Sequence, residues 1–437
     1  MIPEYMYLGD GELKLHHEIK KNRICFSFDC SHDEVLQGSK LSEKRDFFYD
    51  FGGIEITPPH NDKLALVGIL NTLPFAKKEL RISWSVSQKF KDACNLISRV
   101  KIKFPKEVVQ EPLQHLEERS SLCFSGGADS TAALCVMPKT SECVFLRRSK
   151  SGRKTLYDSD AAIESCNRLR TLGYKVHIVE SDFEYLRDPV GFPTDLSVGT
   201  PAILLSDTRE YDSIAFGTIL ESAYGTSGSK FRDYEKSSHY RLWDGLFKSA
   251  GLGYSLPVAG VSEVASSIIC KKHALGKIHQ SCIRGKWAFP CNNCWKCYRK
   301  GAVLAAIDGE YFDYVGRIAS SKEVIMKMMS GDLIKHEGVL TYALENSQSE
   351  ETQEIELLKR ILRVGEIETK WMEGWYAESK KFIHSRYRQE VMENLIFLLG
   401  SMDESGVSEL KKWNNEYDGK RLRDIKKFRL ALDNGIE

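Results

Sequence analysis

Apolar and polar positions between residues 121 and 217 form an alternating series of short apolar runs and longer amphipathic segments. The short runs, which predict strands, are 122–124, 143–146, 175–179 and 213–217. The amphipathic segments, which predict helices, are 160–172 and 201–209. Strands that alternate with helices are typical of a mostly parallel sheet with right-handed crossovers. We therefore predict an α/β fold with flanking helices, which binds its ligand at the carboxyl ends of the strands.

The segments on either side of this region have different patterns. Toward the N-terminus, extended runs such as 24–28 and 47–56 are broken by Gly, Asp, Asn and Pro, which predicts a β-rich accessory domain. Toward the C-terminus, helical apolar spacing at 355–364 and 391–399 predicts a helical domain. The chain has 437 residues, and at about 150 residues per domain this length favours two to four domains. The predicted domains are 1–115, 116–312 and 313–437.

Composition excludes several classes of protein. Hydrophobic residues are 42% and charged residues 28% of the chain, which is too apolar for a disordered protein. The 62 basic and 61 acidic residues leave a formal charge of +1, so no overall positive field attracts nucleic acid. The beginning of the chain mixes charged and apolar residues, so we expect neither a signal peptide nor a membrane span. We therefore expect a cytoplasmic protein.

A glycine-rich motif, SGGADS, directly follows the first of the predicted strands and opens an alanine-rich helix. Gly126 and Gly127 let the backbone approach a polyanion, and the helix N-terminus attracts negative charge. The hydroxyls of Ser125 and Ser130 add hydrogen-bond donors. Asp129 would repel a bare phosphate, which indicates a Mg²⁺ ion or a hydrogen bond to the amides of the loop. We predict a phosphate-binding loop; the alternative is an ordinary glycine turn with helix-capping side chains.

Four cysteines cluster near residue 290 with the spacing C-x8-C-x2-C-x2-C. Thiolates with this spacing can converge on a tetrahedral Zn²⁺, and a closed shell of four sulfurs leaves no position for a substrate. We therefore predict a structural zinc site. Four buried thiols or an iron–sulfur cluster are the alternatives. The predicted metal ligands are Cys282, Cys291, Cys294 and Cys297.

Further charged or small residues lie near these two motifs. Arg147 and Arg148 follow the second predicted strand, at the edge of the sheet where a nucleotide would bind, although a solvated loop explains them equally well. Gly217 ends the last predicted strand at the same edge. We include Arg147 and Gly217 among the predicted nucleotide-binding residues. Arg299 and Lys300 follow the last cysteine, where they could offset the charge of four thiolates.

The motif Ser-Gly-Gly-x-Asp-Ser resembles the signature of the PP-loop ATP pyrophosphatases, which cleave ATP between its α and β phosphates. It lacks the Walker lysine, so transfer of a γ-phosphate is not expected. With the cysteine element, the chain resembles 7-cyano-7-deazaguanine synthase and QueC-like enzymes over residues 120–307, less than half of its length. The resemblance implies a PP-loop fold (adenine nucleotide alpha hydrolase-like), zinc on the four cysteines, and ATP with Mg²⁺ on the loop. It also implies catalytic roles for Ser125, Asp129 and Ser130.

The reaction of this family activates the carboxylate of 7-carboxy-7-deazaguanine with ATP, forms an amide with ammonia and dehydrates the amide to a nitrile. Three segments depart from the family pattern. Thr194 and Asp195 stand where an Arg-Asn pair is usual, Glu263 stands where a lysine is expected, and residues 218–222 are only loosely similar. Enlarged QueC-like proteins also occur in bacterial anti-phage defence systems, where a deazaguanine can be joined to a protein amine. The sequence therefore supports ATP chemistry better than it supports one acceptor.

We predict a homo-oligomeric, ATP-dependent carbon–nitrogen ligase. It would adenylate the carboxylate of a 7-deazaguanine-type acid, release pyrophosphate and couple the acid to an amine, giving an amide, a nitrile or a conjugate with an acceptor protein. Two alternatives stay open. The first is a tRNA-modifying PP-loop enzyme that uses its cysteines for thiolation, although four cysteines committed to zinc would leave none for sulfur transfer. The second is a non-catalytic nucleotide-binding scaffold.

Overall fold

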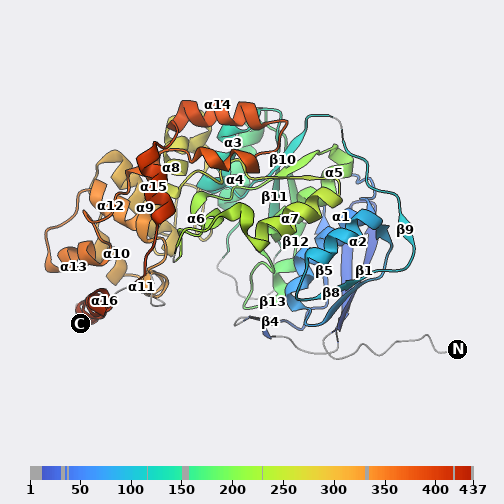
Figure 1. The fold of residues 1–437 in the computed structure, drawn as a ribbon, viewed down its shortest axis with the longest axis horizontal. Helices are drawn as coiled ribbons and strands as arrows, with labels where there is room; N and C mark the ends of the chain where they lie inside the picture. The colour runs from blue at the N-terminus through green and yellow to red at the C-terminus, as the bar shows by residue number, and fades with distance from the viewer. Residues whose placement is uncertain are drawn as a thin grey trace.

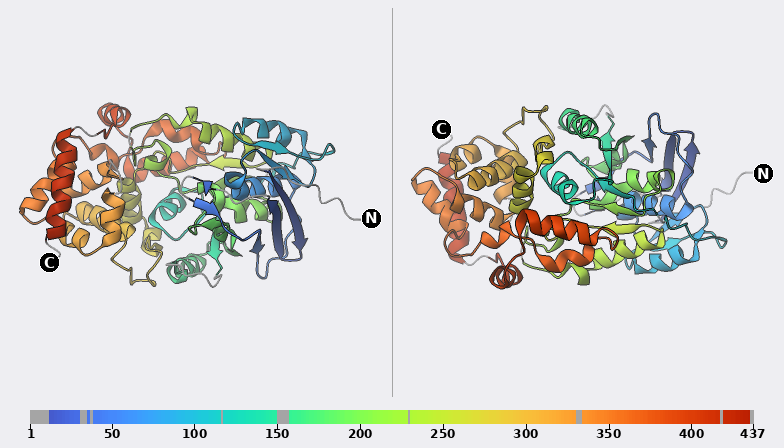
Figure 2. Two further views of the ribbon diagram at one scale, coloured as in Figure 1. Left: turned by 90° about the horizontal axis from the view of Figure 1, so that it is seen from below. Right: turned by 90° about the horizontal axis from the view of Figure 1, so that it is seen from above.

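The computed structural model describes residues 12–30, 35–36, 39–115, 117–149, 157–228, 230–329, 334–416 and 419–434. Within these residues one ten-stranded sheet runs through the molecule, with the N-terminal strands at one end and most C-terminal helices at the other (Figures 1 and 2). In order across the sheet, the strands are β15 (Gly253–Ser255), β14 (Ser213–Ala215), β10 (Ser120–Cys123), β11 (Glu142–Arg148), β12 (Val176–Ser181), β5 (Asp46–Asp50), β2 (Arg23–Cys30), β1 (Glu12–Lys20), β6 (Glu79–Ile82) and β8 (Lys101–Lys103). Two small sheets are β13 (Arg187–Asp188) with β4 (Ser39–Leu41) and β3 (Val35–Leu36), and β7 (Val86–Ser87) with β9 (Val108–Val109).

Helices cover both faces of the sheet and form the C-terminal end of the molecule (Figure 1). Several begin at capping residues: Ser237, Ser262 and Thr352 each accept a hydrogen bond from a backbone N–H of the following first turn. None of the helices in the described ranges is long and apolar enough to cross a membrane. The helices are α1 (Asn61–Thr72), α2 (Gln88–Ala93), α3 (Ala128–Val136), α4 (Asp160–Thr171), α5 (Thr200–Arg209), α6 (Leu220–Ala223), α7 (Ser238–Ser249), α8 (Glu263–Lys272), α9 (Trp295–Asp308), α10 (Tyr314–Ala319), α11 (Lys322–Met329), α12 (Glu337–Asn346), α13 (Gln353–Ile361), α14 (Arg388–Leu399), α15 (Glu404–Lys412) and α16 (Gly419–Asn434).

Five neighbouring strands, β15 to β12, are parallel and form the half of the sheet that contains the predicted motif. In their spatial order, β15-β14-β10-β11-β12, the chain first adds β11 and β12 on one side of β10 and later adds β14 and β15 on its other side. The strand order therefore reverses between β10 and β14. In α/β sheets a ligand-binding crevice forms outside the carboxyl ends of the strands at such a switch point. The SGGADS motif follows β10 and Gly217 follows β14, so both predicted segments lie at this switch point.

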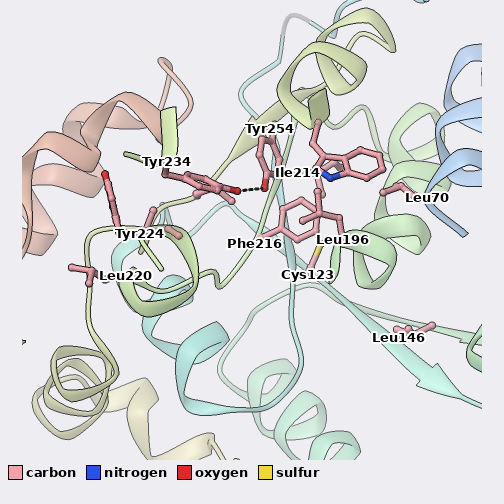
Figure 3. Packing of buried hydrophobic residues seen from close by; sticks show 14 of the residues in the cluster. Leu70, Cys123, Leu146, Leu196, Ile214, Phe216, Leu220, Tyr224, Tyr234 and Tyr254 are labelled. Atoms are coloured by element: carbon pink, nitrogen blue, oxygen red, sulfur yellow. Dashed lines mark hydrogen bonds between the residues drawn. The ribbon is translucent and has the colours of Figure 1, made fainter. Parts of the chain in front are cut away.

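Side chains of the parallel strands alternate between two hydrophobic clusters, because successive residues of a strand point to opposite faces. Cys123 and Ile214 belong to the cluster that includes residues of α1, α5 and α7. Leu122 belongs to the cluster that includes residues of α3, α8 and α14. Figure 3 shows part of the first cluster, in which the hydroxyls of Tyr234 and Tyr254 lie 3.3 Å apart. Apolar strands covered on both faces are typical of a parallel sheet.

The strands and helices predicted between residues 121 and 217 are present, with ends shifted by at most two residues. The N-terminal region differs from its prediction. Its strands continue the central sheet, since Asp50 of β5 pairs with Glu180 of β12, and it also contains α1 and α2. It is therefore a mixed region of the same sheet. The strand predicted at 47–56 ends at Asp50, because a turn with Gly52 at φ +58° follows it.

Candidate active site

The SGGADS motif forms the connection between β10 and α3. Gly126 has a φ of +74°, and a Cβ atom there would lie 3.1 Å from the Cα of Ala162, so the site requires glycine. Ser130 Oγ accepts a hydrogen bond from the Ser125 N–H at 3.2 Å, and the two serine hydroxyls lie 3.0 Å apart. The Gly127 N–H donates to Ser125 Oγ at 3.4 Å. Backbone amides, hydroxyls and a helix N-terminus thus surround one turn, which favours an anion.

Two other segments hold the loop from outside. The Gln280 N–H donates to the carbonyl of Gly126 at 2.8 Å, and Ser281 Oγ accepts from the Ala128 N–H at 3.2 Å. Gly217 comes so close that a Cβ atom there would lie 2.9 Å from the N and Cα atoms of Ser130. The loop conformation is therefore fixed by the fold, and donors that are already in place need no reorganisation when charge develops.

The carboxylate of Asp129 is held through one of its oxygens. Oδ1 accepts hydrogen bonds from Ser266 Oγ at 3.0 Å and from Lys300 Nζ at 2.9 Å. Oδ2 has no hydrogen-bond partner in the described part of the chain, and the side chain is 36% exposed. Burial alone would lower the pKa of Lys300, but the carboxylates of Asp129 and Glu263 outweigh it and raise that pKa. Lys300 therefore stays charged. The Oδ2 atom of Asp129 is left available to bind a ligand.

Glu263 lies behind Lys300 and is fully buried at the start of α8. Nε of Arg299 lies 2.7 Å and 2.8 Å from its two oxygens, and Lys300 Nζ lies 3.4 Å from one of them. Burial would raise the pKa of Glu263, but Arg299 and Lys300 hold it far below its usual range. The two basic residues therefore pair with Glu263 and Asp129. This differs from the expectation that they offset the charge of the cysteine thiolates.

A second buried carboxyl group, that of Glu221, adjoins this network. Both of its side-chain oxygens accept the backbone N–H of Glu263, at 2.9 Å and 3.1 Å. Burial, followed by the charge of Glu263, raises the pKa of Glu221 to about 8. Nδ1 of His336 lies 3.6 Å from Glu263, but burial and the neighbouring Arg299 lower the pKa of His336 to about 4. At pH 7 the network therefore contains a neutral imidazole and a mostly protonated Glu221.

The stability of the protein is expected to depend on pH through Glu221. Its folded-state pKa of about 8 exceeds the ordinary value of 4.5, so between these values the folded state binds more protons and the free energy of unfolding falls as pH rises. Glu221→Gln removes this dependence. The free energy of unfolding of Glu221→Gln, relative to the unmodified protein, should therefore rise from about pH 5 to about pH 8 in urea denaturation. Glu164→Gln, at a partly exposed glutamate of α4, is the control. A pH-independent difference for Glu221→Gln would contradict the raised pKa.

A cavity of about 170 Å³ adjoins the loop. Ser125, Arg148 and Lys296 are among the residues that line it, so two basic side chains lie beside the SGGADS loop. Arg147, which was predicted to contact the nucleotide, is not among the lining residues. Its side chain is 50% exposed and lies 3.7 Å from Glu180. The structure thus places Arg148, rather than Arg147, beside the loop.

The four cysteines predicted as metal ligands lie together, with their sulfur atoms all within 4.8 Å of one another. Cys297 Sγ lies 3.5 Å from Cys294 Sγ and 3.8 Å from Cys291 Sγ. Four sulfurs placed 2.3 Å from a tetrahedral Zn²⁺ are about 3.8 Å apart, so the cluster has the size of a zinc site. The Cys291 N–H donates to Cys282 Sγ at 3.3 Å, which stabilises a thiolate. The cluster can therefore hold a metal ion, and its four soft donors suit zinc.

Replacing one of these cysteines is expected to remove the metal. Cys294→Ser should lower the zinc content of the purified protein from about one ion per chain to near zero and lower the Tm, because three thiolates hold Zn²⁺ poorly and a structural site contributes to folding. Elemental analysis by mass spectrometry and a thermal melt measure both. Cys25→Ser, at a lone and partly exposed cysteine of β2, is the control. Unchanged zinc in Cys294→Ser, or iron in its place, would contradict the assignment.

Two residues that hold the loop, Ser266 and Ser281, were not predicted from the sequence, and Lys300 was assigned a different partner. Ser281 directly precedes Cys282, so the only available signal was its proximity to the cysteine element. Ser266 lies 137 residues after Asp129 and Lys300 lies 171 residues after it. No local pattern connects positions that far apart. They meet because α8 packs against α3, the helix that follows the loop, and α9 packs against α8.

Part of the chain matches a known protein family. Residues 242–414 match a family of unknown function, DUF6395. The match covers less than half of the chain and includes the cysteine cluster, Glu263 and Lys300, whereas the SGGADS loop precedes it. No curated protein and no solved structure matches the chain. The geometry of the site is therefore the basis on which a function can be proposed.

Proposed function

We propose that the protein is an ATP-dependent carbon–nitrogen ligase that adenylates the carboxylate of a 7-deazaguanine-type acid and couples it to an amine. The observation that carries this proposal is the position of the SGGADS loop, at the switch point of the parallel sheet with its amides and hydroxyls around one turn. The cleavage of ATP between the α and β phosphates, and the class of acid, are proposed from the resemblance of the loop and the cysteine element to PP-loop enzymes.

The loop would bind the part of ATP that leaves as pyrophosphate. The amides near Gly127 and the hydroxyls of Ser125 and Ser130 are the donors. Asp129 would turn its free Oδ2 toward the Mg²⁺ that accompanies ATP, since carboxylate oxygens suit that ion. Lys300 keeps the carboxylate in this orientation by holding Oδ1.

The adjoining cavity would bring the two reactants together. The carboxylate of the acid and the α phosphate of ATP are both negative and repel each other, and the side chains of Arg148 and Lys296 supply positive charge where they meet. The 170 Å³ cavity is smaller than a complete nucleotide site, so ATP would extend beyond it. Most of the rate enhancement would come from positioning and charge stabilisation.

The reaction would proceed in two steps. In the first, a carboxylate oxygen of the acid attacks the α phosphorus, the bond to the β-phosphate oxygen breaks, and pyrophosphate leaves. In the second, the amine nitrogen attacks the acyl carbon, the bond to the AMP oxygen breaks, and the amine loses a proton to solvent. Both steps require only ATP, the acid and the amine. With ammonia the product is an amide, and with a protein amine it is a conjugate.

The test is a mass-spectrometric assay of the purified protein with Mg-ATP and 7-carboxy-7-deazaguanine that carries ¹⁸O in its carboxylate, with and without ammonium. The proposal expects AMP and pyrophosphate, with one ¹⁸O atom transferred into AMP, because the carboxylate oxygen becomes part of the adenylate. Reactions without the acid are the control. Unlabelled AMP or the formation of ADP would contradict the proposed attack, and the absence of ATP cleavage would contradict this choice of acid.

A further inference from the structure

A second cavity, of about 650 Å³, lies at the ends of the parallel strands opposite to the SGGADS loop. Asp212, which directly precedes β14, and Gly253, the first residue of β15, line it, whereas the SGGADS loop follows the end of β10. Because these strands are parallel, the two cavities open at opposite ends of the strands. The four residues of β10 span about 13 Å. The second cavity is therefore separate from the proposed active site.

Positive charge is concentrated in this cavity. The residues that line it come from five parts of the chain: α2, residues 114–115, Asp212, α7 with the start of β15, and the segment 381–388. Two carboxylates, Asp212 and Asp244, face five cations. The lining cations are Lys89, Lys248, Lys381, Arg386 and Arg388. Lys248 and Arg386 pair with these two carboxylates, and Lys89 and Lys381 pair with Glu111 and Glu235, which do not line the cavity. Arg388 is therefore the one lining cation without a carboxylate partner in the described residues.

Arg386 and Arg388 have different partners. Arg386 Nη1 lies 3.0 Å from Asp212 Oδ2 and also donates to the carbonyls of His115 and Glu117, so it ties chain segments together. Arg388 donates through Nε and Nη2 to the single carbonyl of Ile383, at 3.3 Å and 3.2 Å. It forms no ion pair with a carboxylate in the described residues. Its guanidinium therefore has donors that an anionic ligand can use.

His384 provides a neutral donor or acceptor in the same cavity. Its ring packs on Gly253, where a Cβ atom would lie 2.3 Å from the ring, so glycine is required to make room for it. Burial lowers the pKa of His384, and nearby cations, Arg386 and Arg388 among them, lower it further against the opposing effect of Asp212. The Nδ1 atom is buried and has no hydrogen-bond partner within the described part of the chain.

We propose that this cavity binds a small phosphate-bearing molecule of up to nucleotide size. Several cations from different elements, including a guanidinium with free donors, match the charge and geometry of phosphate groups. The volume of 650 Å³ lies in the range of small-molecule sites and far exceeds that of one phosphate. Of the aromatic side chains Tyr240, Tyr254 and Phe382 that line the cavity, the last two are only 5% and 1% exposed and the first is partly exposed. The cavity therefore offers at most one of these aromatic faces for stacking by single-stranded nucleic acid.

The experiment is isothermal titration of the full chain with ADP and, separately, with pyrophosphate, comparing the unmodified protein with Lys248→Gln/Arg388→Gln. The proposal expects at least one of these ligands to bind at a site whose affinity falls about tenfold to a hundredfold in the double variant, because charged hydrogen bonds are lost. Weakened binding of ADP alone would assign a nucleotide. Weakened binding of both would assign the phosphate groups themselves.

The matched control is Lys236→Gln/Lys412→Gln, which removes the same charge from side chains that are 83% and 70% exposed and do not line the cavity. It should leave both titrations unchanged, and thermal melts of both double variants verify folding. Equal affinities in the Lys248→Gln/Arg388→Gln and unmodified proteins would overturn the proposal. So would an effect restricted to a single-stranded 12-nucleotide DNA, which would indicate a nucleic-acid surface. The result is independent of the proposed ligase activity, because no turnover is measured.

Discussion

Replacing Asp129 by asparagine is expected to lower the rate of pyrophosphate release by about 10²- to 10³-fold, the usual cost of removing one electrostatic stabiliser from an active site. Asparagine keeps the shape of the side chain and its contact with Ser266 but removes the negative charge from the oxygen that would face Mg²⁺. It also leaves Lys300 without one of its two carboxylate partners. A coupled pyrophosphate assay with Mg-ATP and 7-carboxy-7-deazaguanine measures the rate.

Asp160→Asn is the matched control for this variant. Asp160 occupies the first turn of α4 as Asp129 occupies the first turn of α3, but it is exposed, and no hydrogen bond or ion pair joins it to the loop in the described residues. Its replacement should change the rate less than about twofold, since a solvated charge has little effect on chemistry elsewhere. If Asp129→Asn releases pyrophosphate as fast as the unmodified protein, the loop carboxylate has no part in the reaction.

Replacing Glu263 by glutamine is expected to lower the free energy of unfolding by about 3–5 kcal/mol, because it leaves buried cations without their counter-charge. Glu263 is 0% exposed, and its partners Arg299 and Lys300 have side chains that are 11% exposed. Glutamine can still accept a hydrogen bond, but it cannot balance two positive charges. Urea denaturation at pH 7 measures the loss, with the midpoint and slope fitted together.

Two comparisons show whether this loss comes from the buried pair. Glu164→Gln breaks a partly exposed ion pair of α4 and should cost less than about 0.5 kcal/mol. The double variant Glu263→Gln/Arg299→Gln should lose less stability than the sum of its two single variants, because both remove the same interaction. A loss in Glu263→Gln no larger than that in Glu164→Gln would show that the buried carboxylate is not needed to balance Arg299 and Lys300.

Much of the parallel half of the sheet could be predicted from the sequence because its signals are local. An apolar run, a glycine turn and a helix start follow one another within residues 120–136. Similar local patterns of apolar and polar residues predicted β11, α4, β12, α5 and β14. Helix α1 was missed for a physical reason. It is buried on almost every side, so it lacks the polar face that gives an amphipathic helix its periodicity. An apolar segment of this kind cannot be assigned to helix or strand by pattern alone.

The candidate site was predictable only where its residues are close in sequence. The loop hydroxyls and the four cysteines lie within two short motifs, and the structure brings each set together. The residues that support Asp129 come from α8 and α9, and only the tertiary fold shows which helices lie beside the loop. The pairing of Glu263 with Arg299 was equally hidden. From sequence alone, a glutamate is expected to be exposed, because nothing close to it in the chain identifies the cationic partner that allows its burial.

The pairing of β5 with β12 has a consequence for the synthesis of the protein. Asp50 meets Glu180, about 130 residues later in the chain, so one edge of β5 has no strand to pair with until β12 has left the ribosome. At roughly 5–20 residues per second this interval lasts about 6 to 26 s. During that time the nascent N-terminal strands expose unpaired backbone N–H and C=O groups, which attract other extended chains. Newly made chains should therefore depend on chaperones that cover extended segments, more than chains whose neighbouring strands are made in succession.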